Sequence, residues 1–302
     1  MSARRLTWRQ RLTLAAPYVW ISAFFLAPML LIAKISLSQS VLARPPYAPV
    51  FSVSDSLAQI WSKAQSFSFD AYRLLAMDRL YLDAYLSSLS VAAVSTLLTL
   101  LVAYPFALAL ARSPRAWRPF LIGLAVAPFW TSFLIRVYAW IALLKDEGLI
   151  NKALMALGVT QAPIEMFATT GAVVVGIVYS YLPFMLLPIY SALEQQDGGL
   201  REAAADLGAS PLETFLHVTL PLSRDGVIAG ALLVFIPAVG EFVIPDLLGG
   251  SDMLMIGRTL WNDFFANHDW PSASAAAIVL VSLLIIPLLL WERARLREET
   301  QR

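Results

Sequence analysis

The residues best able to do chemistry are three charged side chains within otherwise apolar stretches. Glu241 and Asp246 lie in FIPAVGEFVIPDLLGG, and Arg136 lies in PFWTSFLIRVYAW. A charge near the centre of a membrane helix costs about 2.5–3.5 kcal/mol on insertion scales, so each of them needs a reason to be there. Carboxylates attract cations and aromatic faces bind ammonium groups, so these side chains are candidates for binding a cation.

Arg136 is the residue that does not fit a cation path, because a free guanidinium would repel a cation. Arg136 and Glu241 both fall in the outer half of their apolar runs. We therefore expect Arg136 to be neutralised by Glu241 or by a helix end and to shape a gate, although a structural ion pair or helix clamp explains it equally well. Lys34 is expected to reach the outer interface with its long side chain. The candidate residues of a path or gate are Trp130, Arg136, Tyr138, Trp140, Glu241 and Asp246. Tyr138 and Trp140 could equally belong to an ordinary interfacial belt.

Other chemistry finds little support in the sequence. The absence of cysteine excludes disulfides and thiolate metal sites. The two histidines, His217 and His268, have no partner spacing for a metal or a nucleophile, so we expect neither a catalytic nor a metal site. The chain lacks the G-x-x-x-x-G-K-[ST] phosphate loop. If ATP drives its function, another chain must bind the nucleotide.

The elements that must position these residues are apolar helices. The 302-residue chain is 59% hydrophobic and 14% charged, with a mean hydropathy of +0.68, whereas soluble domains are about 25% charged. Apolar runs long enough to cross about 30 Å of hydrocarbon occur near 13–37, 84–111, 119–144, 170–193, 226–249 and 272–291. The first run is too long for a signal peptide and lacks its cleavage pattern. The fifth is interrupted by proline and glycine, as in transporter helices that line a cavity.

The arginines indicate the orientation. They cluster before the first run, between the second and third runs, and after the sixth run. Since such clusters mark the cytoplasmic side, an all-α integral membrane protein with six transmembrane helices has both termini in the cytoplasm. We expect a first helix and periplasmic loop over 1–80, with a short amphipathic helix in the loop. A transmembrane domain over 81–291 and a cytoplasmic tail over 292–302 follow.

One cytoplasmic loop, LREAAADLGASPLETFLHVTLPLSRDG, looks built to be held by a partner. Ser210 and Glu213 form a capping box with Pro211 at the first helical position, and Gly208 suits a helix C-cap. The loop is predicted to form a helix over 199–207, a bend and a helix over 211–217 that ends before Pro221. It places apolar side chains in water, which usually marks a partner site: Leu207, Leu212, Phe215 and Leu216. The alternative is that the loop folds back on its own helices.

The segment EAAADLGASPLETFLHVTLP resembles the Glu-Ala-Ala loop of ABC-importer permeases, with Val218 as a mild departure. The resemblance extends over about residues 80–290 and implies the fold of binding-protein-dependent importer permeases. It also implies that the loop (about 199–221) forms coupling helices that sit in a groove of an ATP-binding subunit. The matching positions are Glu202, Ala203, Ala204, Gly208, Phe215, Leu220 and Pro221.

Longer segments resemble the polyamine branch of that family, with the putrescine type slightly favoured over the spermidine type. They are PFWTSFLIRVYAWIALLKDEGLINKAL, AVGEFVIPDLLGG and MIGRTLWNDFFANHDWPSASA. This resemblance implies a bacterial inner-membrane subunit in a lipid bilayer. Its partners would be a second permease, an ATP-binding dimer that holds ATP and magnesium, and a periplasmic binding protein that delivers polyamine. The net charge of +1 gives no sign of nucleic-acid binding.

Three alternatives remain open. The chain could be an ABC permease for another solute, an ATPase-independent secondary transporter or channel, or, least favoured, an intramembrane enzyme.

Overall fold

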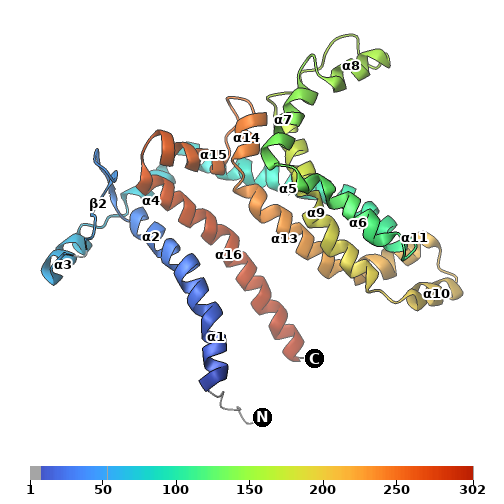
Figure 1. Ribbon diagram of the computed structural model, residues 1–302, viewed down its shortest axis with the longest axis horizontal. Coiled ribbons are helices and arrows are strands. Elements are labelled where there is room, and N and C mark those ends of the chain that lie inside the picture. Colours follow the sequence, from blue (N-terminus) through green and yellow to red (C-terminus); the bar gives the residue numbers. More distant parts are fainter. Residues whose placement is uncertain (1–7, 53, 302) are drawn as a thin grey trace. The chain divides into compact units, whose positions relative to one another are not determined.

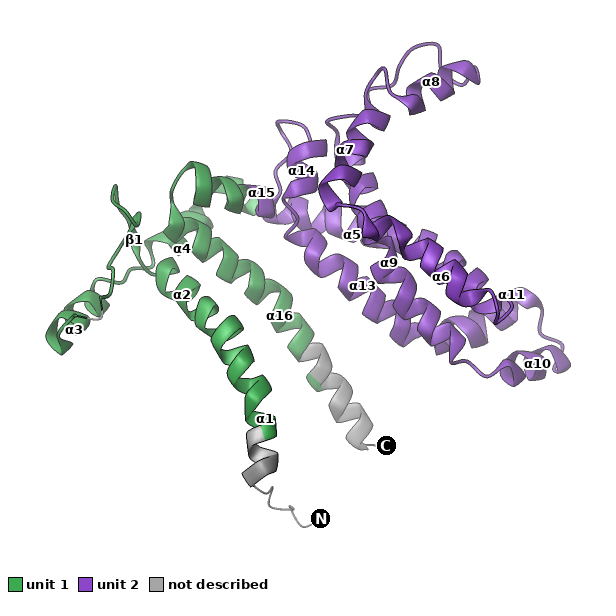
Figure 2. Ribbon diagram, in the orientation of Figure 1, with its two compact units in different colours: residues 1–82, 259–302 green, residues 83–258 purple. Residues whose placement is uncertain are grey.

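The computed structural model describes residues 8–52 and 54–301, without the side chains of 8–12, 290–292 and 294–301. The described residues are helical except for loops and one two-stranded hairpin. They form two compact units, residues 1–82 with 259–302 and residues 83–258 (Figure 2). The last long helix therefore belongs to the same unit as the first.

The unit that holds both termini is built on two long helices (Figure 1). The first runs as α1 (Trp8–Ile21), the π-helical turn η1 (Ser22–Leu26) and α2 (Ala27–Ser36). It packs through α2 against α16 (Trp270–Gln301). The segment between α2 and α5 (Arg79–Arg112) holds the smaller elements of the unit, which are β1 (Gln39–Ser40), β2 (Tyr47–Ala48), α3 (Leu57–Gln65) and α4 (Asp70–Met77).

The hairpin of this unit is antiparallel, with Gln39 opposite Ala48. Lys34 reaches beyond the end of α2, where its Nζ donates a hydrogen bond of 2.7 Å to the Pro49 carbonyl. The same ammonium lies 4.2 Å from the centre of the Tyr47 ring. The Lys34 ammonium is therefore held by the loop that follows α2.

The other unit carries the residues that the sequence singled out. Its helices in chain order are α5 (Arg79–Arg112), which begins in the first unit, α6 (Arg118–Val126), η2 (Ala127–Trp130), α7 (Phe133–Leu144), α8 (Leu149–Ala156), α9 (Thr170–Glu194), α10 (Gly198–Asp206), α11 (Pro211–Thr214), η3 (Phe215–Thr219), α12 (Leu220–Leu222), α13 (Arg224–Val239) and α14 (Val243–Leu248). Two more, α15 (Ile256–Trp261) and η4 (Asn262–Ala266), lead back to the first unit.

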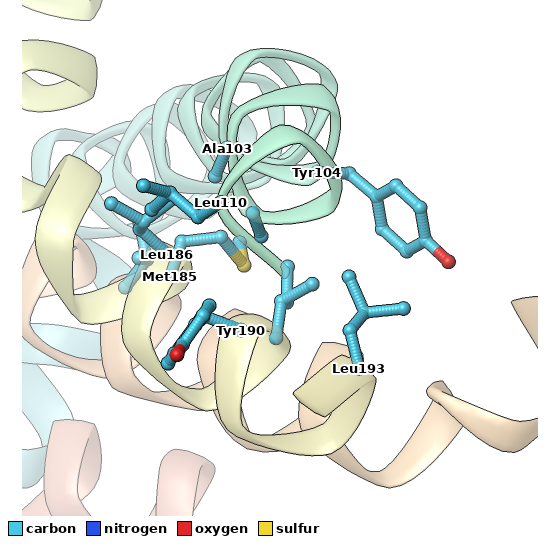
Figure 3. Packing of buried hydrophobic residues seen from close by; sticks show 10 residues of the cluster. Ala103, Tyr104, Leu110, Met185, Leu186, Tyr190 and Leu193 are labelled. Carbon is cyan, nitrogen blue, oxygen red and sulfur yellow. The ribbon is translucent and has the colours of Figure 1, made fainter. Parts of the chain in front are cut away.

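The core of this unit lies among α5, α9 and α13. Figure 3 shows its buried side chains, among them Tyr104 on α5 and Met185 on α9. Two glycines let α13 approach α9 closely. A Cβ on Gly226 would lie 2.6 Å from the Pro188 carbonyl oxygen, and one on Gly230 would lie 2.9 Å from Met185 Sδ. Small residues permit close helix packing in membranes, so this seam depends on them.

Four described helices are long and apolar enough to cross a membrane: Thr13–Ser36, Arg79–Arg112, Thr170–Glu194 and Trp270–Leu289. Two bent pairs raise the possible number of spans to 6. The expected six spans stand at the upper end of that range, and the all-helical membrane fold is confirmed.

The run expected as one helix over 119–144 is broken, which corrects the prediction. Arg118–Trp130 and Phe133–Ala156 meet at 86°, since Thr131 and Ser132 have extended backbone with ψ of 154° and 135°. Pro128, which lacks a backbone N–H, lies just before this break in the 3₁₀ turn η2. The expected interruption of the fifth run is confirmed, because α13 ends at Val239 and α14 begins at Val243.

Candidate functional site

The loop between α9 and α13 has the predicted helix–bend–helix form. The Ser210 hydroxyl accepts a hydrogen bond from the Glu213 N–H (3.3 Å), and the Glu213 carboxylate accepts one from the Ser210 N–H (2.7 Å). Gly208 has a φ of +85°, the left-handed conformation that glycine adopts without strain. The capping box and the glycine C-cap are therefore confirmed.

The second helix of the loop was predicted to end before Pro221, and this is wrong. The chain continues from α11 through the π-helical turn η3 and α12 to Leu222. The Leu220 N–H bonds to the Phe215 carbonyl, five residues back. Pro221 then lies inside this continued helix, directly after the π-helical turn, and supplies no N–H to the helix ladder. This second half of the loop meets α13 at 64°.

Of the four apolar side chains that were expected in water, three are exposed and one is not. Leu207 is 89% exposed, and Leu212 and Leu216 are exposed as well. Phe215 instead packs edge-on against Tyr104 of α5, with ring centres 5.7 Å apart. The fold-back alternative therefore holds for Phe215, while the other three apolar side chains remain on the surface.

The positions of the Glu-Ala-Ala pattern divide in the same way. Glu202, Ala203, Gly208, Leu220 and Pro221 are exposed, and Ala204 and Phe215 are partly buried. The Gln196 side-chain amide, just after α9, donates to the Thr219 carbonyl (3.0 Å) and so links the start of the loop to its second half. The loop is therefore held on its inner side, and the exposed positions of the pattern face away from the helices.

The break between α13 and α14 holds Glu241 by three donors. Its Oε1 accepts hydrogen bonds from the N–H groups of Val243 (3.0 Å) and Ile244 (3.4 Å), at the start of α14. Its Oε2 accepts one from the Tyr181 hydroxyl on α9 (2.5 Å). The carboxylate thus caps the helix that follows the break and joins it to α9.

The expected neutralisation of Arg136 by Glu241 or a helix end is wrong in this structure. The guanidinium lies 4.4 Å from the ring centre of Phe129 and 5.9 Å from that of Phe133. Arg136 is 8% exposed, and its Nε and Nη1 are buried without a hydrogen-bond partner in the part of the chain that the structure describes. The reason is geometric: helical side chains point toward the N-terminus of their helix, which here leads to the rings around the α6–α7 bend.

The other candidate path residues are not brought together. Trp130 is 85% exposed at the bend, Tyr138 is exposed on α7, and Trp140 lies edge-on to Tyr179 with ring centres 5.5 Å apart. Asp246 forms an ion pair of 3.2 Å with Arg258 of α15.

Sequence reasoning missed Tyr181 and Arg258 as partners of the two carboxylates. Tyr181 stands in a continuous apolar run without any local signal. The sequence did offer a signal for Arg258, because this charged residue lies in MIGRTLWNDFFANHDWPSASA, one of the segments that resemble the polyamine branch.

The family described as "Binding-protein-dependent transport system inner membrane component" matches residues 11–294 of the chain. Two relatives carry the name "Spermidine/putrescine transport system permease protein PotB". That of Escherichia coli (strain K12) is 44% identical over 228 residues, covering 76% of this chain and 82% of the relative. That of Haemophilus influenzae is 37% identical over 287 residues, covering 94% and 93%.

A third relative, "Inner membrane ABC transporter permease protein YdcU" of Escherichia coli, is 33% identical over 221 residues and covers 69% of each chain. Among solved structures, a chain of a bacterial ABC transporter for the import of the acidic polysaccharide alginate superposes with a TM-score of 0.69. The superposition covers 96% of both chains at 15% identity, so this likeness shows the fold alone.

Proposed function

We propose, from the premise that this chain belongs to the family of binding-protein-dependent transport system inner membrane components, that it carries polyamine into the cytoplasm. The chain is a multi-pass inner-membrane permease subunit, and ATP hydrolysis is the task of a separate subunit. The observation that carries the cargo assignment is the 37% identity to the Haemophilus influenzae spermidine/putrescine permease over 94% of the chain.

The coupling role rests on the geometry of the loop from α10 to α12. It presents Glu202, Ala203 and Gly208 on an exposed, doubly capped surface, and its apolar side chains Leu207 and Leu212 are uncovered. This surface suits a groove of an ATP-binding subunit that holds ATP and magnesium. ATP binding would move the loop and, through it, α13 and the break before α14.

The complete transporter then contains a second permease, an ATP-binding dimer and a periplasmic binding protein that delivers the cargo. Both termini of this chain lie in the cytoplasm, as the arginine clusters indicate. Residues 81–291 form its transporting part. We propose that Trp130, Tyr138, Trp140 and Asp246 line the path at separate points. Within the polyamine class we favour putrescine over spermidine on the similarity of segments.

A second candidate is an ABC permease for another solute, since the name of the relative YdcU gives no cargo. A secondary transporter or channel has no use for a capped, exposed loop of this kind. The cargo is therefore the main point to be tested.

The test uses the intact complex, purified through this chain in mild detergent and placed in lipid nanodiscs. ATP hydrolysis is measured with the binding protein loaded with putrescine, with spermidine or with an unrelated solute. We expect an ATPase to co-purify and one of the polyamines to stimulate hydrolysis. An ATPase that ignores both polyamines would overturn the cargo, and an intact complex without an ATPase would overturn the coupling role.

A further inference from the structure

A row of aromatic rings connects Arg136 to Glu241 within the second unit. The Arg136 guanidinium lies over Phe129. The Phe129 ring is 5.7 Å from that of Phe184, which is 6.0 Å from that of Tyr181. The Tyr181 hydroxyl donates to Glu241. One cation and one carboxylate thus stand at opposite ends of three rings.

Neither charge at the ends of the row has a counter-ion among the described residues. Glu241 is 8% exposed and accepts three hydrogen bonds, but no described ion pair includes it. Arg136 contacts the rings of Phe129 and Phe133 and forms no ion pair within the part of the chain that the structure describes. Buried charges in proteins are normally paired. The Glu241 end of the row therefore lacks a cation, whereas the Phe129 end already holds the Arg136 guanidinium.

The middle of the row is open. Phe184 is 44% exposed, although its neighbours Pro183 and Met185 on α9 are buried. Tyr181 alone separates this accessible ring from the Glu241 carboxylate, and an ammonium group over the two rings is attracted by their quadrupoles and, at longer range, by the carboxylate. Tyr181 strengthens this, since a hydroxyl that donates to a carboxylate becomes a better acceptor through its own oxygen.

We propose that Phe184 and Tyr181 form a binding site for a primary ammonium group of the cargo, with Glu241 as the residue that positions Tyr181. Arg136 occupies the Phe129 face and repels any second ammonium from that end, so the rest of the cargo extends away from it. This inference rests on the proposed function, because it assigns a site to the polyamine.

The first experiment measures equilibrium binding of radiolabelled putrescine and spermidine to the complex in nanodiscs without binding protein, both without nucleotide and with ATP and vanadate. Phe184→Leu removes the ring. We expect its Kd to rise about tenfold, which lies between the effects of losing an exposed and a desolvated cation–π contact, whereas Phe184→Tyr stays within about twofold of the wild type. The matched control is Phe106→Leu, the same change at an exposed phenylalanine of α5, which leaves Kd unchanged.

Two further variants separate the roles at the ends of the row. Glu241→Gln keeps the shape but removes the charge, so Kd rises for both amines. Arg136→Gln removes the repulsion, so Kd falls more for the amine with three charges than for the amine with two. Equal effects on both amines would contradict the role of Arg136.

The outcomes distinguish this site from the proposed function. If polyamine-loaded binding protein stimulates the wild-type complex but Phe184→Leu and Phe106→Leu bind polyamine equally well, the site is wrong and the proposed function stands. The same holds if the wild type binds no polyamine in either nucleotide state. If no polyamine stimulates the wild type, both fail.

Discussion

Tyr181 on α9 donates a 2.5 Å hydrogen bond to Glu241, in the break between α13 and α14. The two residues are 60 positions apart. Because the other carboxylate oxygen caps α14, a single side chain joins α9 to the helix that follows the break. The Glu241 side chain therefore braces the corner that the break forms.

Replacing Tyr181 by phenylalanine should destabilise this corner. The change leaves a buried carboxylate oxygen without its donor, which costs about 1–3 kcal/mol. We expect a lower Tm for the purified complex. Tyr179→Phe is the control on the same helix, because Tyr179 makes a described ring contact with Trp140 that the substitution keeps. Equal Tm values for the two variants would show that the Tyr181 hydroxyl does not stabilise the corner.

Replacing Gly208 should uncouple the ATPase from transport. A branched residue in the left-handed conformation costs about 1–2 kcal/mol, and a Cβ at Gly208 would meet no other atom within 4 Å. The effect of Gly208→Val is thus one of backbone conformation alone. We expect uptake per ATP hydrolysed to fall, and Gly208→Asn to be milder since asparagine tolerates this conformation.

The control for that prediction is Gly158→Val, which imposes the same strain in a different loop, at a φ of +70° and also in open space. Uptake per ATP should stay normal there. An equal loss in both variants would indicate a general folding defect and would speak against a coupling role for Gly208.

Reversing the charge of Glu202 should weaken the binding of this chain to the ATP-binding subunit. Glu202 is exposed on α10, so Glu202→Lys can disturb a partner without disturbing the fold. We expect about a tenfold loss of affinity for the ATPase, or ~1.4 kcal/mol, measured by co-purification and by titration of the free ATPase. Glu165→Lys is the matched control at another exposed glutamate, and comparable affinities for the two variants would refute the assignment.

Adding a methyl group to Gly226 should force α9 and α13 apart. The new Cβ would lie 2.6 Å from the Pro188 carbonyl oxygen, which belongs to a helix backbone and cannot move easily. Overpacking of this kind costs about 1–3 kcal/mol, so Gly226→Ala should lower the Tm. Gly123→Ala on α6 meets nothing within 4 Å and should keep or slightly raise it. Equal Tm values for Gly226→Ala and Gly123→Ala would show that α9 and α13 pack less tightly than the structure indicates.

The features that sequence reasoning predicted correctly are those encoded over short distances. Ser210 and Glu213 are three positions apart, and a capping box needs nothing else. The left-handed turn at Gly208 and the interruption around Gly240 follow from the properties of glycine and proline. The long spans follow from hydropathy, because the bilayer thickness sets their length.

Other features needed the tertiary structure, because they depend on which helices pack together. Arg136 and Glu241 have similar depth in the sequence pattern, yet depth does not tell which way a side chain points around its helix. The packing of α9 against α13 and α14 brings Tyr181 to Glu241, while the bend at Thr131 and Ser132 directs Arg136 to Phe129. The sequence by itself determined the long unbroken spans, the break before α14 and the form of the exposed loop. The rotation and contact of whole helices, which no local pattern encodes, decided the partner of each buried charge.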